Sequence, residues 1–183
     1  MGLHTSTCSG LSFKDVKVPA ANLLGNEGEG YKIAMYALDS SRIGVAAQAT
    51  GLAEAALAHA IAYTKERVQF GKPLSKFQNT QFQLADMAIK VEAANLMLHN
   101  AGRDKAEGRP YTISASMAKK FCSDMAMEVT TKAVQLFGGY GFCEDYPVAR
   151  LMRNAKVTQI YEGTNEAQQM VVGGSLLLSL IHI

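Results

Sequence analysis

The sequence predicts an all-α fold, an up-and-down helical bundle. Apolar side chains recur every three or four residues along three long stretches, which is the period of a helix with one buried face. The connections between these stretches are short and contain turn residues, such as Gly108-Arg109-Pro110. Long helices with short connections pack as antiparallel neighbours, so the pattern favours a bundle. The 183 residues suit one domain, or one domain with a fragment of another.

Residues 1–24 are the first element and differ in pattern from the rest of the chain. Residues 11–18 (Leu-Ser-Phe-Lys-Asp-Val-Lys-Val) alternate apolar and polar side chains, which is the period of a strand, and Pro19 ends the run. A single strand is not stable by itself, so its sheet partners are expected outside this chain. We therefore predict that residues 1–24 are the remnant of a separate β-domain and that the chain is truncated at its N-terminus.

Residues 25–177 are expected to form the helical domain. One helix is predicted to open with a capping box, Ser75 followed by Gln78, and another to end at Gly138. The expected helices run from Gly28 to about Arg67, from about Ser75 to about Gly102, from about Thr112 to Phe137, after Pro147, and from about Thr164. The predicted buried stripes comprise Leu52, Ala55, Ala56, His59 and Tyr63 on the first helix, and Leu84, Met87, Ala88, Val91, Ala94 and Leu98 on the second.

The end of the sequence has an unusual composition. Residues 176–183 are apolar and contain no signal that ends a helix. Residues 178–183 (Leu-Ser-Leu-Ile-His-Ile) are also the translation of a transposase sequencing adapter. We therefore predict that residues 178–183 are a non-native tail and that the natural C-terminus is missing. A different series of codons in the DNA would contradict this prediction.

Charge and composition exclude several classes of function. The net charge is +2 and the basic residues are scattered, which argues against a nucleic-acid partner. No apolar run reaches the length of a membrane span, and no signal sequence follows Met1. Cys8, Cys122 and Cys143 are far apart, and the four histidines form no zinc motif, so we expect free thiols in a reducing compartment and no metal site.

The loop at residues 161–166 (Tyr-Glu-Gly-Thr-Asn-Glu) is the most informative stretch for function. It places one carboxylate, that of Glu162, between an aromatic ring and a glycine, just before a short apolar helix. A carboxylate at such a junction can stand at the mouth of a pocket and accept a proton. Taken alone, the residue is more typical of a solvated carboxylate on a surface loop.

Two further loops carry residues that suit an anionic cofactor. Arg67 precedes the turn Phe70-Gly71-Lys72-Pro73, and its guanidinium could meet two oxygens of a pyrophosphate at once. The alternative is a cation that stabilises the C-terminus of a helix. Gln135 leads from a helix into Gly138-Gly139-Tyr140-Gly141. This loop follows a helix rather than a strand, so it is no dinucleotide fingerprint, and a helix stop is the alternative.

Together, these loops resemble those of the acyl-CoA dehydrogenases, the flavin enzymes that desaturate fatty acyl thioesters, and in particular the short-chain, butyryl-CoA type. The resemblance covers residues 3 to about 177. It implies that the chain is the C-terminal helical domain of such a protein, preceded by the last strand of its middle β-domain. The chain departs from the usual pattern at 167–169, where Ala-Gln-Gln replaces Ile-Gln-Arg.

The resemblance also implies a role for each loop. Glu162 is the expected catalytic base, since relatives that carry the base elsewhere use the position of Ser41, which is not acidic here. The expected substrate-binding residues are Asp39, Ser40, Ser41, Arg42 and Gly163. The expected FAD-binding residues are Arg67, Gln78, Gln135, Leu136, Phe137, Gly138, Gly139, Thr164, Asn165 and Glu166. A helix ion pair between Arg42 and Asp39, and an N-cap role for Thr164, are the alternatives that the residues themselves offer.

The implied reaction is the FAD-dependent α,β-dehydrogenation of a short-chain acyl-CoA to a trans-2-enoyl-CoA, with electrons passed to electron transfer flavoprotein. The resemblance implies a homotetramer and a fragment that is inactive alone. We expect a bacterial cytoplasm, with the mitochondrial matrix as the alternative. Three alternatives remain open: a short/branched-chain acyl-CoA dehydrogenase, a flavoenzyme of the same fold with other chemistry, and a non-catalytic helical assembly domain.

Overall fold

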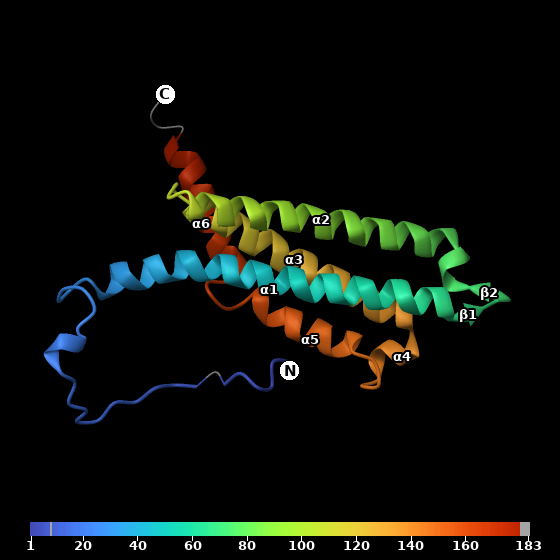
Figure 1. Ribbon diagram of the computed structural model, residues 1–183, viewed down its shortest axis with the longest axis horizontal. Coiled ribbons are helices and arrows are strands. Elements are labelled where there is room, and N and C mark those ends of the chain that lie inside the picture. The colour runs from blue at the N-terminus through green and yellow to red at the C-terminus, as the bar shows by residue number, and fades with distance from the viewer. Residues whose placement is uncertain (8, 180–183) are drawn as a thin grey trace.

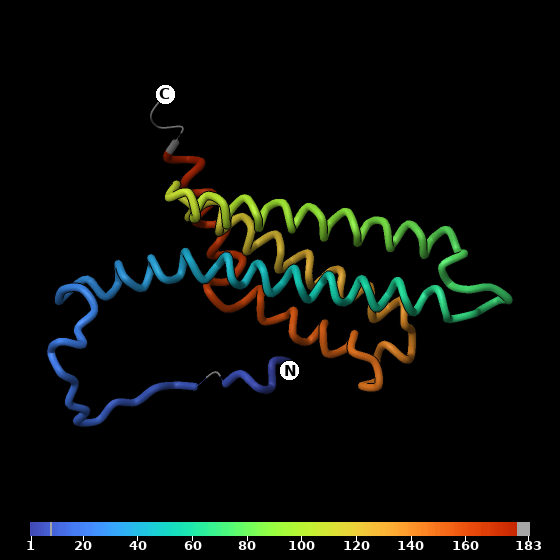
Figure 2. The backbone as a smooth tube through the Cα atoms, in the orientation of Figure 1, coloured from blue at the N-terminus to red at the C-terminus, as the bar shows by residue number. Residues whose placement is uncertain are grey.

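The chain folds into a bundle of antiparallel helices in the computed structural model, which describes residues 1–7 and 9–179 (Figure 1). The helices are α1 (Gly30–Glu66), α2 (Gln78–Ala106), α3 (Thr112–Phe137), α4 (Gly139–Phe142), α5 (Val148–Thr158) and α6 (Asn165–Ser179). The helices α1, α2 and α3 run side by side, and the chain reverses direction between them, so the predicted up-and-down bundle is confirmed (Figure 2). Helix α5 packs against α1 and α3, and α6 packs against α3.

Short elements connect the long helices. A small antiparallel hairpin of β1 (Val68–Gln69) and β2 (Lys72–Pro73) turns the chain back after α1, with Val68 opposite Pro73 and Gln69 opposite Lys72. Phe70 and Gly71 form its two-residue turn, and both have positive φ, as the tight turns of hairpins require. Single turns of 3-10 helix, η1 (Ala20–Asn22) and η2 (Leu74–Lys76), precede α1 and α2.

Alanines form much of the core of the bundle. On α1 the fully buried alanines are Ala46, Ala49, Ala53, Ala56 and Ala60. Steps of alternately three and four residues keep them on one face, and their small side chains let the helices approach closely. The predicted stripe on α1 is therefore wrong in register, since only Ala56 of that stripe is fully buried and His59 is exposed. On α2, the predicted stripe is confirmed at Met87, Val91 and Ala94, whereas Ala88 is exposed.

The predicted strand at residues 11–18 does not form, and this correction concerns the N-terminal part of the predicted fold. These residues are exposed and irregular, with a bend at Lys14 and Asp15, and the segment runs away from the bundle before α1 begins (Figure 1). A strand needs a neighbouring strand to bond its backbone groups, and none of the described residues pairs with this segment. Near the start of the chain, the Leu3 N–H donates to Oδ1 of Asn154 at 2.8 Å. The assignment of residues 1–24 to a β-domain stays a prediction.

The ends of the helices test the other sequence signals. The predicted capping box is wrong: Phe77 is the N-cap of α2 without a side-chain cap, and Ser75 lies in η2. Gly138 ends α3 as predicted, with φ of 61° and ψ of −135°, a conformation that favours glycine.

Of the predicted tail 178–183, residues 180–183 lie outside the described residues, and residues 178 and 179 continue α6. No helix in the described ranges is both long and apolar enough to cross a membrane.

Candidate active site

Glu162 lies in the tight turn between α5 and α6. Its backbone has φ of 57° and that of Gly163 has φ of 86°, so two consecutive residues take the left-handed conformation. The Ser41 hydroxyl, which α1 contributes, lies 2.6 Å from Oε2 of Glu162 and donates a hydrogen bond to it. The carboxylate is half-buried. The structure therefore brings the predicted base and the position that relatives use for the base into direct contact, and this geometry suits a carboxylate that accepts a proton.

Two buried side chains hold the backbone of this turn. Nζ of Lys119, on α3, donates to the Gly163 carbonyl at 2.7 Å and to Oδ1 of Asn165 at 2.9 Å. Nε2 of Gln168, on α6, lies 3.2 Å from the Glu162 carbonyl and 3.1 Å from the Gly163 carbonyl. Neither Lys119 nor Gln168 has exposed surface. Burial lowers the pKa of Lys119 to about 8.

Sequence reasoning missed Lys119, although one signal could have found it. Lys119 falls in phase with Ala115, Cys122 and Ala126 on the buried face of α3. A lysine in phase with an apolar stripe must either bend out to solvent or find oxygen acceptors inside the protein, because an unpaired buried charge is costly. The period of α3 therefore placed Lys119 in the interior, but it could not tell which acceptors it would meet.

The predicted FAD contacts at the start of α6 divide into inward-facing and outward-facing residues. The Asn165 side chain is buried and bonds to Lys119, Ser123 and Asp124 of α3. Thr164 is exposed, and its hydroxyl accepts from the Ala167 N–H at 3.3 Å, which is the N-cap alternative. Glu166 is exposed, and hydrogen bonds from its own N–H and from Thr164 lower the pKa of its carboxyl.

The residues predicted to bind substrate cluster beside Glu162 on α1. Nη1 of Arg42 lies 2.6 Å from Oδ1 of Asp39, and Oδ2 of Asp39 accepts from the Thr112 hydroxyl at 2.6 Å. Arg42 is buried between α1 and α3, so the ion pair of the alternative interpretation exists but is not a surface pair. Lys105 donates to the Ser40 hydroxyl and ties the end of α2 to the same part of α1. Asp39 is half-buried and is therefore still accessible.

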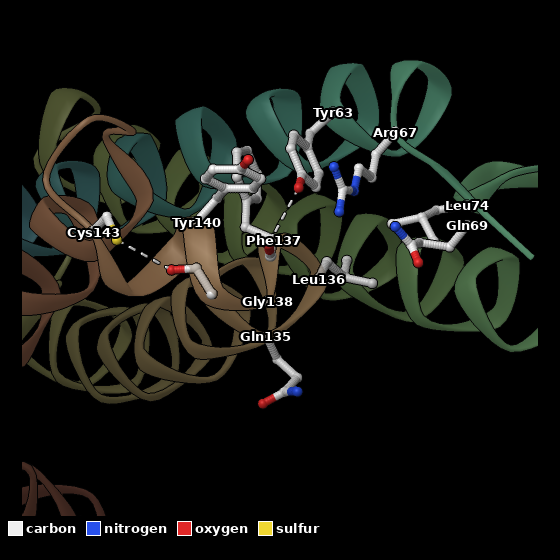
Figure 3. Close-up of a pocket in the computed structure, with 11 residues that line it drawn as sticks. Tyr63, Arg67, Gln69, Leu74, Gln135, Leu136, Phe137, Gly138, Tyr140 and Cys143 are labelled. Atoms are coloured by element: carbon white, nitrogen blue, oxygen red, sulfur yellow. Dashed lines mark hydrogen bonds between the residues drawn. The ribbon is translucent and has the colours of Figure 1, made fainter.

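A cavity of about 520 Å³ opens at the other end of the bundle and contains most of the remaining predicted cofactor residues (Figure 3). Its lining includes Arg67 and the five predicted residues Gln135, Leu136, Phe137, Gly138 and Gly139. The Tyr63 and Phe137 rings stack at 4.0 Å between centroids, and the Arg67 guanidinium lies 5.5 Å from the centre of the Tyr140 ring. Gln78 is exposed and is not part of this lining.

The chemistry of this cavity fits a phosphate-containing cofactor such as FAD. Arg67 supplies a forked cation, and the aromatic rings of Tyr63 and Tyr140 supply flat apolar surface. A Cβ built on Gly139 would meet no atom of the chain within 4 Å, so packing inside the chain does not require a glycine there. A glycine at such a position leaves room for a group from outside the chain to approach the backbone.

The two candidate sites lie far apart along α1, one beside Ser41 in its first half and one at its C-terminal end. Ser41, beside Glu162, and Arg67, in the cavity, are separated by about 26 residues, which correspond to roughly 39 Å along a helix. The structure thus brings Arg67 together with the Gly138 loop, and Glu162 together with Ser41, but it keeps these two groups apart. Among the described residues, no group of three or more His, Cys, Asp or Glu side chains is arranged to hold a metal ion.

Comparisons with known proteins agree on one family. The family model described as "Acyl-CoA dehydrogenase, C-terminal domain" matches residues 28–177. A short-chain-specific acyl-CoA dehydrogenase of Megasphaera elsdenii is 63% identical over 177 residues, which are 97% of this chain and 46% of that protein. The chain spans about half the length of the curated relatives it matches.

Two solved structures support the same assignment. A butyryl-CoA dehydrogenase structure from M. elsdenii has a TM-score of 0.89 and 64% identity over 90% of this chain and 43% of that chain. A chain in a structure of the electron transferring flavoprotein of Acidaminococcus fermentans, which concerns flavin-based electron bifurcation, has a TM-score of 0.89 and 61% identity over the same shares. The helical bundle, the match across residues 28–177 and these identities together show that the chain belongs to the acyl-CoA dehydrogenase family.

Proposed function

We propose that the protein containing this chain is an FAD-dependent acyl-CoA dehydrogenase that converts short-chain acyl-CoA thioesters to trans-2-enoyl-CoA. The observation that carries the proposal is the position of Glu162, in a strained turn where Ser41 holds one of its carboxylate oxygens. Backbone strain of this kind gathers at active sites. The relatives named as short-chain-specific support the choice of substrate.

In this reaction Glu162 is the general base. Ser41 donates to Oε2, which orients the carboxylate and leaves Oε1 to take the proton from the α-carbon of the thioester. The backbone N–H of Glu162 is assigned to the thioester oxygen, where negative charge develops as the proton leaves. FAD, when bound, supplies the acceptor for the hydride from the β-carbon.

The residues assigned to FAD follow from the cavity. Arg67 would neutralise the pyrophosphate, and the Gly138–Gly139 backbone would approach it closely, while Gln135, Leu136 and Phe137 form the adjacent wall. At the other end of the bundle, Thr164 and Glu166 are exposed next to Glu162 and are assigned to a flavin there. The contacts of Asn165 and Gln78 with FAD stay predictions.

The proposed assembly is a homotetramer in which neighbouring subunits complete each other's cofactor sites. Its first support is the separation of roughly 39 Å between Ser41 and Arg67 along α1. One cofactor would have to span that length to reach both candidate sites within the same subunit. Its second support is an exposed apolar row on α2, formed by Phe82, Ile89 and Leu96 at seven-residue intervals. Such a row suits helix packing against a second copy of the chain.

Electron transfer flavoprotein is the proposed electron acceptor. The support is the A. fermentans structure, because it concerns electron transferring flavoprotein and a chain of it is 61% identical to this one. We assign the protein to a bacterial cytoplasm, with the mitochondrial matrix as the alternative, since the relatives compared above come from bacteria.

An anaerobic titration of the full-length protein tests the function. Butyryl-CoA is expected to bleach the absorbance of the bound flavin promptly. A flavin that responds only to branched or longer thioesters would indicate the short/branched-chain alternative. A bound flavin that no acyl-CoA reduces would overturn the proposal in favour of other flavin chemistry, and a protein without flavin would favour the assembly domain.

A further inference from the structure

Lys119 has the largest fully buried side chain among the residues that the structure describes. Its ammonium lies inside the bundle, where α3 faces the turn between α5 and α6. Burying a cation is unfavourable unless the protein supplies oxygen acceptors, so its partners indicate why it is there. Both of its acceptors, the Gly163 carbonyl and Oδ1 of Asn165, follow Glu162 within three residues.

The turn that Lys119 contacts is strained. Glu162 has φ of 57°, a conformation that is unfavourable for any residue with a side chain, and it persists only where surrounding contacts impose it. The contacts that impose it here come from two helices. Lys119 of α3 and Gln168 of α6 both donate to the Gly163 carbonyl, and Gln168 also lies within reach of the Glu162 carbonyl.

Gly163 is part of the same arrangement. A Cβ built on this residue would lie 2.7 Å from Nε2 of Gln168, so a side chain at 163 would displace the Gln168 amide. The glycine therefore allows the positive φ and also admits the donor that holds the turn. The nearby Asn165 side chain bonds to Ser123 and Asp124 in addition to Lys119. The end of the turn is therefore bonded to α3 at further points.

The charged groups that act on Lys119 lie on α1, α3, α6 and the turn before α6. Asp124 on α3, Glu166 on α6 and Glu162 in the turn attract its ammonium, whereas Arg42 on α1 repels it. Burial outweighs these attractions and lowers the pKa of Lys119 to about 8. At neutral pH the side chain is thus mainly a cation, which donates charge-assisted hydrogen bonds to both acceptors.

We propose that Lys119 and Gln168 are positioning residues that hold the strained Glu162–Gly163 turn and thereby aim the Glu162 carboxylate. The inference rests on the proposed role of Glu162 as the base, and it adds the residues that keep the base in place. A base held by two buried donors on separate helices is fixed before substrate arrives. Small displacements of a reacting group cause large losses of rate, so loss of either donor should reduce turnover without removing any atom that touches substrate.

The test uses the full-length protein and two variants of similar side-chain length, Lys119→Met and Gln168→Met, with the exposed Lys65→Met on α1 as the control. At saturating butyryl-CoA, each of the two variants is expected to lower the rate of flavin reduction by about 100-fold. The dissociation constant of the acyl-CoA should change less than about threefold, since neither side chain contacts substrate in the proposal. Rates within about threefold of the wild type in both variants would overturn the proposal.

Amide hydrogen exchange gives a readout that does not depend on activity. The Tyr161 and Asn165 amides donate to the Val157 and Gln159 carbonyls, so a fixed turn protects them. In both variants, the Tyr161 and Asn165 amides are expected to exchange at least about tenfold faster than in the wild type. The amides of α1 should exchange at the same rate as in the wild type. If a variant fails to fold, the wild type still decides, because exchange of these two amides as fast as in the exposed segment 16–18 would overturn the proposal.

This combination separates the two hypotheses. If no acyl-CoA reduces the wild-type flavin, the proposed function fails, while the exchange measurements still show whether Lys119 and Gln168 hold the turn. If the flavin is reduced but exchange and rate are unchanged in the variants, the function stands and the positioning role is rejected.

Discussion

The two ends of the bundle hold their candidate functional residues in opposite ways. Around Glu162, the side chains of Lys119, Asn165 and Gln168 are buried and bonded to the same short turn. Around Arg67, the side chains line an open cavity, and the guanidinium faces the ring of an exposed tyrosine, Tyr140. Internal contacts alone fix the first end, whereas the second presents its groups outward.

In the proposed function, this difference corresponds to a division of tasks between the two ends. A base must be held within a fraction of an ångström of its productive position. Several side chains of the same chain therefore bond to the turn that carries it. In the proposed assembly, the cofactor site instead needs surface that remains open until the cofactor and a neighbouring subunit cover it. The comparison predicts that substitutions at one end change the rate of chemistry and that substitutions at the other end change the retention of flavin.

The largest effect is expected for Glu162→Gln in the full-length protein. The amide cannot accept the α-proton, so reduction of the flavin by butyryl-CoA should slow by about 10³- to 10⁴-fold. The affinity for FAD should stay unchanged at the cavity end. Stopped-flow absorbance measures the rate, and Asp145→Asn, an exposed carboxylate in the loop between α4 and α5, is the control. A variant that keeps a tenth of the wild-type rate would remove Glu162 from the role of base.

The next effect concerns the burial of Lys119 and has a defined dependence on pH. Its pKa is about 8 in the folded chain and 10.5 as the ordinary value, so between these values the unfolded chain retains a proton that the folded chain has lost. The free energy of unfolding should therefore rise with pH between about 8 and 10.5. This added stability is lost when the pH is lowered back to about 8.

Chemical unfolding of the chain and of its Lys119→Met variant from pH 7.5 to 10 measures this dependence. The free energy of unfolding of the wild type relative to the variant should increase by about 2 kcal/mol over that range. A difference that does not change with pH would mean that the ammonium is solvated, and the contrast between the two ends would then be weaker than the structure indicates.

A smaller effect is expected for Arg67→Ala. Removal of a charge-assisted contact to the pyrophosphate should weaken FAD binding by about 10- to 100-fold. Once the variant is saturated with FAD, its rate of flavin reduction should match that of the wild type. Fluorescence titration of the apoprotein with FAD measures the affinity, and Lys65→Ala, two residues away and exposed, controls for loss of positive charge. A variant with normal affinity but a slow reaction would reverse the proposed division of tasks.

The smallest effect is expected for Gln78→Ala. Because Gln78 is exposed and lies outside the lining of the cavity, its replacement should change the affinity for FAD by less than about twofold. The same titration measures it. A loss as large as that of Arg67→Ala would show that the site extends beyond the cavity, onto the start of α2.

The sequence predicted the long helices well because their signals are local. The bounds of α3 coincide with the predicted 112–137, since a turn with proline precedes it and Gly138 follows it. The buried face of α1 was misjudged because the closest packing falls on alanines, and alanine also occupies exposed positions of the same helix, such as Ala47, Ala58 and Ala62. The strand at 11–18 failed because the alternating pattern specifies a strand only where another strand pairs with it.

For the candidate site, too, local features could be predicted from the sequence and long-range contacts could not. The sequence by itself determined the helical bundle, the acyl-CoA dehydrogenase resemblance and the turn that carries Glu162, because each depends on residues close together in the chain. Only the tertiary structure decided that Ser41 meets Glu162, that Arg67 shares a cavity with the Gly138 loop, and that Lys119 donates to the Gly163 carbonyl. These contacts join residues far apart in sequence, and the packing of the helices against one another sets them, which no local pattern encodes.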